Sequence, residues 1–191
     1  MTAKLHVLAL SGSLRQASFN TMALRACRKL APDDVSIEIF EGLDQIPHYN
    51  EDLRAEGFPP VAADLRQRIK AADALLFAIP EYNHSLPGVL KNAIDWASRP
   101  PEGPLLQKSF AILGASMGAM GTIRAQYHMR DILIFFDGTV VNKPEVFIGQ
   151  AQNKFNAQGE LTDEPTANIL RTLLEALKIQ TLQLRALRQG G

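Results

Sequence analysis

Short apolar runs alternate with helical patterns along most of this chain of 191 residues. The runs are Leu5–Leu10, Val35–Phe40, Ala74–Ile79, Phe110–Leu113 and a fifth, Thr139–Val141, which continues past Pro144 into Val146–Ile148. Strands separated by helix-length segments are typical of crossover units, which place parallel strands in one sheet and helices on both of its faces. The pattern therefore predicts an α/β fold with a five-stranded parallel sheet.

Helical segments with apolar side chains at helical spacing lie between these runs. They begin near Ser18, Pro60, Ser85, Thr122 and Pro165, and the polar stretch 150–164 is expected to be a loop. Right-handed crossovers leave few ways to wind five such strands, and a common order is 2-1-3-4-5. The run Val35–Phe40 alternates apolar with polar residues, which favours the edge position for strand 2. We expect a three-layer sandwich that forms a single domain over residues 1–191.

The charge balance limits the partners of the chain. Twenty Lys and Arg residues offset twenty Asp and Glu residues, so no overall field favours nucleic acid or an anionic membrane. The longest apolar runs are far shorter than the roughly 20 residues that cross a bilayer, which predicts a cytoplasmic protein. The single cysteine, Cys27, is expected to be a buried thiol, and Trp96 a core residue. The four histidines (His6, His48, His84 and His128) lie on separate elements, so no metal site is predicted.

The loop after the first strand, in "LALSGSLRQASFN" from Leu8 to Asn20, lacks both common glycine fingerprints of nucleotide loops. Hydroxyl, amide and guanidinium groups instead gather at the start of the next helix, where free N–H groups favour an anion. These side chains belong to Ser11, Ser13, Arg15, Ser18 and Asn20, and Leu14 lies among them. The loop predicts a phosphate site. The alternative is an ordinary turn in which Ser18 caps the helix.

The second unusual loop lies in "AIPEYNHSLPGVLKNAIDW", Ala78 to Trp96, and follows the most apolar strand. Tyr82 can supply a flat wall, and Asn83 with nearby backbone N–H groups can bond the heteroatom edge of a planar ring. The alternative is a helix entry with Ser85 as the cap and a proline near the first helical position. That alternative leaves Glu81, Tyr82 and Asn83 unexplained.

The third loop contains Gly114, Ser116 and Gly118 in the G-x-S-x-G spacing of a serine hydrolase nucleophile. Such a hydrolase needs an acid and then a histidine downstream, but no acid lies between Ser116 and His128, the last histidine. Gly118 and Gly121 are instead expected where the backbone approaches something flat. The following helix is expected to aim its N-terminus at that ligand and to stabilise negative charge on it.

Together, "GSLRQASFN", "PEYNHSLPGVLKNAIDW" and "GASMGAMGTIR" resemble the NAD(P)H-dependent FMN reductase family, which includes quinone and chromate reductases. The resemblance covers Leu5 to about Gly149. It implies a flavodoxin-like fold, non-covalent FMN, and assembly as a dimer or tetramer. It also implies that Ser11, Ser13, Arg15, Ser18 and Asn20, with Leu14 beside them, hold the FMN phosphate, that Pro80, Glu81, Tyr82, Asn83 and Ser85 line the flavin ring, and that Ser116 and Gly118 approach the ring.

The expected activity is hydride transfer from NADPH or NADH to FMN and then to quinones, azo dyes or chromate. One pocket serves both half-reactions, which predicts ping-pong kinetics without a catalytic side chain. The rival is a flavodoxin-type electron carrier, which binds FMN but does not turn over a nicotinamide. Such carriers generally present an acidic face, so the neutral charge favours the enzyme. Arg124, Tyr127 and Arg130, beside the apolar run "ILIFF", are expected to form an assembly contact.

Overall fold

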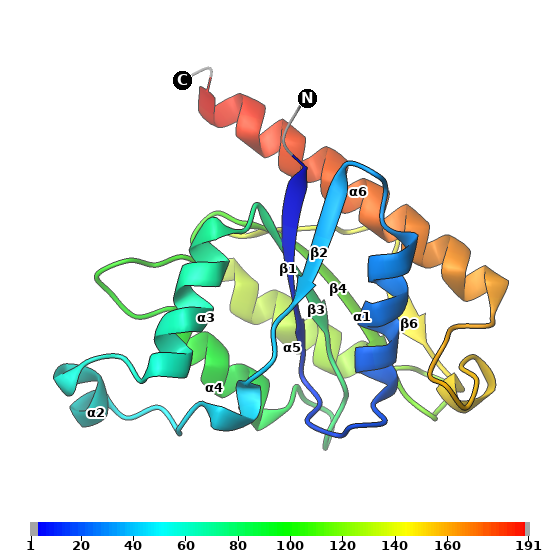
Figure 1. Ribbon diagram of the computed structural model, residues 1–191, viewed down its shortest axis with the longest axis horizontal. Helices are drawn as coiled ribbons and strands as arrows, with labels where there is room; N and C mark the ends of the chain where they lie inside the picture. Colours follow the sequence, from blue (N-terminus) through cyan, green and yellow to red (C-terminus); the bar gives the residue numbers. More distant parts are fainter. Residues whose placement is uncertain (1–3, 190–191) are drawn as a thin grey trace.

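The computed structural model describes residues 4–189, which form a parallel sheet between two layers of helices (Figure 1). The strands are β1 (Leu5–Ser11), β2 (Val35–Ile39), β3 (Ala74–Ala78), β4 (Ser109–Ala115), β5 (Thr139–Val140) and β6 (Val146–Ile148). The helices are α1 (Phe19–Leu30), α2 (Glu51–Glu56), α3 (Pro60–Ala71), α4 (Gly88–Ala97), α5 (Ile123–Ile134) and α6 (Glu164–Gln189). Short 3₁₀ turns cover Leu43–Gln45 and Ala151–Asn153.

The sheet has the order β2-β1-β3-β4-β5 with every pair parallel, so the predicted flavodoxin-like order and the edge position of β2 are confirmed. The single fifth strand that the sequence predicts is two strands in the structure. β5 pairs with Ser109 and Phe110 at the start of β4, whereas β6 pairs with Leu113–Ala115 at its end. Pro144 lies between the two strands and has no N–H to donate to β4, which accounts for the break.

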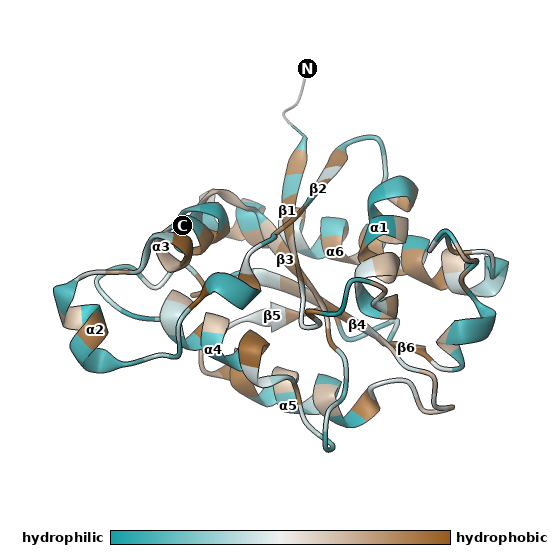
Figure 2. Ribbon diagram, turned by 60° about the horizontal axis from the view of Figure 1, so that its bottom comes forward, coloured by the Kyte–Doolittle hydropathy of each residue, from teal (hydrophilic) through white to brown (hydrophobic). Residues whose placement is uncertain are grey.

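The two faces of the sheet bury different helices. Val7 and Ala9 of β1 pack with α1 and α6, whereas Leu8 and Leu10 pack with α3, α4 and α5. Because alternate residues of a strand point to opposite faces, a strand buried on both faces must be apolar throughout. In Figure 2 the central strands are accordingly brown to white, while much of the teal lies on the helices and loops. This packing fixes the strand ends that carry the loops.

Two side chains confirm the predicted core. Trp96 has no exposed surface, and its indole N–H donates to the Pro47 carbonyl at 2.8 Å. Cys27 is buried in α1, and burial raises the pKa of its thiol to about 12. The thiol is therefore protonated and enclosed, not a reactive group.

The starts of two helices differ in their agreement with the sequence prediction. Ser18 is the cap of α1, accepting from the N–H groups of Asn20 and Thr21 at 3.2 and 3.4 Å. Ser85 is not the cap of α4, because that helix begins at Gly88 with Pro87 before it. The short helix α2 has no counterpart in the sequence prediction. None of the helices within residues 4–189 has the length and apolar character that a bilayer crossing requires.

Candidate functional site

The loops that follow β1, β3 and β4 meet at one end of the sheet, as parallel topology requires (Figure 1). A cavity of about 160 Å³ lies between them, and we call it the loop-end cavity. Residues of all three loops line it: Ser13, Arg15, Ser18, Phe19, Asn20, Pro80, Glu81, Tyr82, Ala115, Ser116 and Met117. Most of the predicted site residues are therefore brought together. Ser11, Leu14, Asn83, Ser85 and Gly118 are not part of this lining.

The loop after β1 offers several unused hydrogen-bond donors. The backbone N–H groups of Leu14, Gln16 and Ala17 donate to no acceptor in the part of the chain that the structure describes. The Arg15 side chain is exposed, and its guanidinium lies 5.5 Å from the centre of the Phe19 ring. Free amides, an arginine fork and the N-terminus of α1 together form a site that suits a phosphate.

Two predicted phosphate ligands have other partners in the structure. Asn20 is only 3% exposed. Its side-chain Nδ2 donates to the Ala115 carbonyl at 3.0 Å, and its Oδ1 accepts from the Ala115 N–H at 2.9 Å. Asn20 thus ties α1 to the end of β4. The buried Ser11 hydroxyl lies 2.8 Å from that of Thr21. Both side chains position the loop, and Ser13 and Arg15 remain the groups that face outward.

The loop after β3 makes a tight hairpin. Tyr82 and Ser85 exchange two backbone hydrogen bonds of 3.0 Å across a two-residue turn. Asn83 and His84 form that turn with φ of 51° and 64°, values that this hairpin type requires and that non-glycine residues seldom adopt. The Ser85 hydroxyl lies 3.1 Å from Nδ1 of His128 in α5. The hairpin holds Tyr82 at the edge of the loop-end cavity with its side chain exposed.

Glu81 has a role that the sequence prediction misses. Its side chain is 13% exposed and accepts from the N–H groups of Arg124 and Ala125 at 3.0 and 3.3 Å, while the Arg124 guanidinium lies 3.3 Å away. The carboxylate therefore neutralises the positive end of α5. The expectation that this helix N-terminus points at a ligand is wrong, because Glu81 occupies the first-turn amides.

Close contacts within the protein account for two glycines of the loop after β4, Gly114 and Gly121. A Cβ at Gly114 would lie 1.8 Å from the Thr122 hydroxyl, and the positive φ of Gly121 brings it against the backbone of Phe147. Both close approaches are internal to the protein. The Ser116 hydroxyl donates to the Gly121 carbonyl at 2.7 Å, and within residues 4–189 it makes no hydrogen bond to a histidine, unlike a hydrolase nucleophile. Gly118 is exposed, and a Cβ there would meet the Ser116 hydroxyl at an ordinary contact distance of 3.7 Å.

Exposed apolar side chains lie on the same loops, a feature that the sequence prediction left out. Tyr82, Met117 and Met120 are 52%, 64% and 63% exposed, and Leu14 is exposed as well. Single exposed apolar residues are ordinary, but Tyr82 and Met117 line the loop-end cavity and the other two lie on the same loops, so together they offer a surface for a flat apolar molecule. The signal in the sequence was the pair of methionines in a glycine-rich loop.

Comparison with known proteins agrees with this geometry. Residues 5–153 match the model of the family described as NADPH-dependent FMN reductase. The chain is 53% identical over 185 residues to an NAD(P)H-dependent FMN reductase from Pseudomonas aeruginosa, covering 97% of this chain and 100% of that one. It is 45% identical over 178 residues to a quinone reductase from Escherichia coli, covering 92% and 95%. Among solved structures, the flavoenzyme NAD(P)H:(acceptor) oxidoreductase FerB from Paracoccus denitrificans superposes with a TM-score of 0.85 at 34% identity, covering 94% and 98%.

Proposed function

Because this chain belongs to the NADPH-dependent FMN reductase family, we propose that it binds FMN without a covalent link and passes hydride from NADPH or NADH to quinones. The observation that supports FMN is the phosphate-sized donor set at the edge of the loop-end cavity, made by the free amides of Leu14, Gln16 and Ala17 and by the Arg15 side chain. A single terminal phosphate needs such a compact set, whereas bridging pyrophosphates are typical of glycine-rich loops.

The residues of the chain bind and orient the cofactor. Arg15 and the free amides hold the phosphate, and Ser18 and Asn20 fix the loop that presents them. Pro80, Tyr82 and Ser116 line the remainder of the cavity, where the ring would lie. Bound FMN supplies the hydride chemistry, so the protein contributes position and surroundings.

The acceptor and the nicotinamide are proposed to use one opening in turn. The exposed Tyr82 and Met117 give this opening an apolar rim that suits flat quinones, and such a rim selects little among azo dyes or other acceptors. We include chromate among the proposed acceptors because the same opening is exposed. Initial rates with NADPH and a quinone should give parallel double-reciprocal lines. Intersecting lines would contradict the shared opening.

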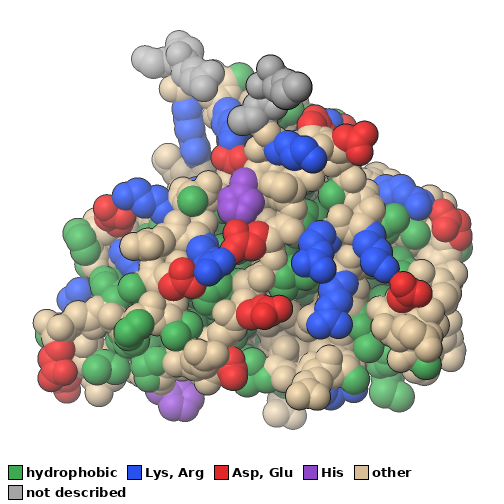
Figure 3. All heavy atoms as spheres, viewed as in Figure 1, with side chains coloured by type: hydrophobic (Ala, Val, Ile, Leu, Met, Phe, Trp, Pro, Cys, Tyr) green, Lys and Arg blue, Asp and Glu red, His purple; other side chains and the backbone are tan. Residues whose placement is uncertain are grey.

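Anaerobic mixing with NADPH tests the function directly. We expect the yellow protein to lose its visible flavin absorbance within seconds and to regain it when a quinone is added. No bleaching over minutes would favour the electron carrier, the second candidate. The face drawn in Figure 3 carries basic and acidic side chains side by side, and the chain as a whole is neutral, which favours the enzyme over such a carrier. A colourless protein that takes up no FMN would contradict both.

We propose that the protein works as a homodimer or homotetramer in the cytoplasm. Of the residues expected to form the assembly contact, Arg124 pairs with Glu81, Tyr127 donates to Glu145, and Arg130 donates to the Val141 carbonyl. The assembly proposal therefore rests on the exposed Ile134 and Phe135. A buried single thiol at Cys27 is compatible with a reducing compartment.

A further inference from the structure

A second and larger cavity lies on the other side of the loop that follows β1. Its volume is about 490 Å³, within the range of small-molecule sites. One wall is the face of α1 that carries Thr21, Arg25 and Arg28, and the other wall is the segment 39–44, which runs from the last residue of β2 into the following loop. Ser11 and residues 13–16 form its floor. We call this cavity the α1–β2 groove.

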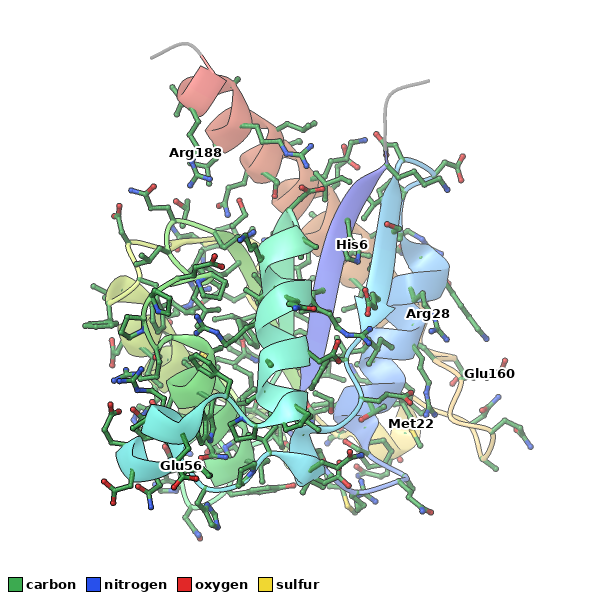
Figure 4. The ribbon with its side chains drawn as sticks, turned by 60° about the vertical axis from the view of Figure 1, so that its left-hand side comes forward. His6, Met22, Arg28, Glu56, Glu160 and Arg188 are labelled. Carbon is green, nitrogen blue, oxygen red and sulfur yellow. The ribbon has the colours of Figure 1, made fainter. Side chains whose placement is uncertain are left out.

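The groove contains arginines without acidic partners. Arg25 and Arg28 are exposed, and neither lies within 4.0 Å of a carboxylate in residues 4–189. Lys29, the next residue of the same helix, does pair, with Glu160 at 3.0 Å. Figure 3 shows Lys and Arg side chains gathered over α1 beside β2, and Figure 4 labels Arg28 on that helix. Two unpaired arginines one turn apart suit a phosphate.

The rest of the groove is mixed in character. The half-buried Ile39 contributes apolar surface, with the mostly buried Phe40 and Leu43 beside it, and Glu41 and Asp44 contribute two carboxylates. A phosphate alone would have no use for that apolar wall, whereas a nucleotide has a flat base, a ribose that donates hydrogen bonds, and a phosphate. The ligand class that matches every wall is therefore a nucleotide.

The groove adjoins the loop-end cavity. Ser13 and Arg15 line both, so one ligand can pass over this loop from one cavity to the other. In dinucleotide-binding folds that take NADP, an arginine near the adenosine ribose accommodates the 2′-phosphate. The α1–β2 groove offers two arginines for such a contact, Arg25 and Arg28.

We propose that the α1–β2 groove binds the adenosine end of NADPH and that Arg25 and Arg28 contact its 2′-phosphate. This inference rests on the proposed function, since it names where that donor lies. NADH has a hydroxyl in place of the phosphate, so these arginines favour NADPH over NADH. Glu41 on the opposite wall repels the phosphate and limits that preference.

The test uses the FMN-loaded protein and adenosine 2′,5′-bisphosphate, titrated by calorimetry. We expect binding to the unaltered protein and a loss of about tenfold or more in each of the variants Arg25→Gln and Arg28→Gln, because each keeps the stem and removes one charged fork. Lys29→Gln is the matched control, since it removes a cation from the same helix outside the groove. Glu41→Gln should tighten binding. Thermal melting confirms that each variant is folded.

Kinetics provide the second measurement. The variants should raise the KM for NADPH about tenfold while the KM for NADH, kcat and FMN content stay within about twofold. Absent calorimetric binding, equal binding by all variants, or an equal rise of KM for NADH would overturn the assignment. If NADPH fails to bleach the flavin while the bisphosphate still binds through Arg25 and Arg28, the proposed function fails and the nucleotide site stands.

Discussion

Arg15 is the side chain on which the cofactor proposal depends most. It is exposed, makes no ion pair with the carboxylates of residues 4–189, and lines the loop-end cavity beside the free amides. A charged hydrogen bond of this kind contributes about 1.5–3 kcal/mol, so Arg15→Ala should weaken FMN binding about 10- to 100-fold. Fluorescence titration of FMN into the apoprotein measures the change. Arg171→Ala removes an exposed arginine of α6 as the control, and equal FMN affinity in both variants would contradict the phosphate role.

Asn20 acts on stability first and on the cofactor second. Asn20→Ala removes both hydrogen bonds to Ala115 and leaves a buried N–H and a buried carbonyl without partners. We expect the free energy of unfolding to fall by about 2 kcal/mol, because an unsatisfied buried polar group costs about 1–3 kcal/mol. Urea unfolding measures this. Asn168→Ala, an exposed asparagine on α6, is the control. If Asn20→Ala lowers the free energy of unfolding by less than the control does, water replaces the Asn20 side-chain amide as the partner of Ala115.

At the scale of the element, Glu81 couples the loop after β3 to α5. Glu81→Gln keeps the shape but removes the negative charge from the first turn of α5. We expect a loss of about 0.5–1 kcal/mol in the free energy of unfolding, since a charge at a helix terminus contributes that much. Added salt should reduce the difference between the variant and the unaltered protein. Glu56→Gln on the exposed helix α2, labelled in Figure 4, is the control. No difference between the two variants would contradict the capping role.

The elements show which features a sequence can predict. The runs at Leu5–Leu10 and Ala74–Ile79 are apolar throughout, and burial on both faces of a parallel sheet requires that pattern, so strands β1 and β3 follow from the residues alone. The split between β5 and β6 depends on which part of β4 each segment meets, and no local pattern encodes that register. From the sequence alone, two short apolar runs on either side of a proline predict one interrupted strand.

The same reasoning applies to the site. Hydroxyls and an arginine before a helix indicate an anion site, and the loops do come together at the predicted end of the sheet. The sequence could not show that Asn20 binds the backbone of Ala115, 95 residues away, or that Glu81 binds the amides of α5. These partners are tertiary contacts, and the side chains that make them have the same polar character as side chains that would bind a ligand.

On the scale of the whole molecule, the end of α5 leaves an apolar surface without a covering element. Ile134 and Phe135 are 74% and 76% exposed, and the short edge strand β5 begins four residues after Phe135. An exposed Phe buries about 150–250 Å² when covered, which contributes several kcal/mol at about 25 cal/mol per Å². This surface lies outside both cavities, so its loss should leave FMN binding unaltered.

We therefore expect the protein to sediment as a dimer or tetramer at micromolar concentration and the double variant Ile134→Ser, Phe135→Ser to dissociate. Each Ser substitution removes apolar area from the contact, so the dissociation constant should rise by at least about 100-fold, equivalent to about 2.7 kcal/mol. Analytical ultracentrifugation across a concentration series measures it. Leu187→Ser removes a comparably exposed apolar side chain from α6 as the control. If the unaltered protein is a monomer, the assembly proposal is wrong. If only the control variant dissociates, the contact between subunits lies elsewhere.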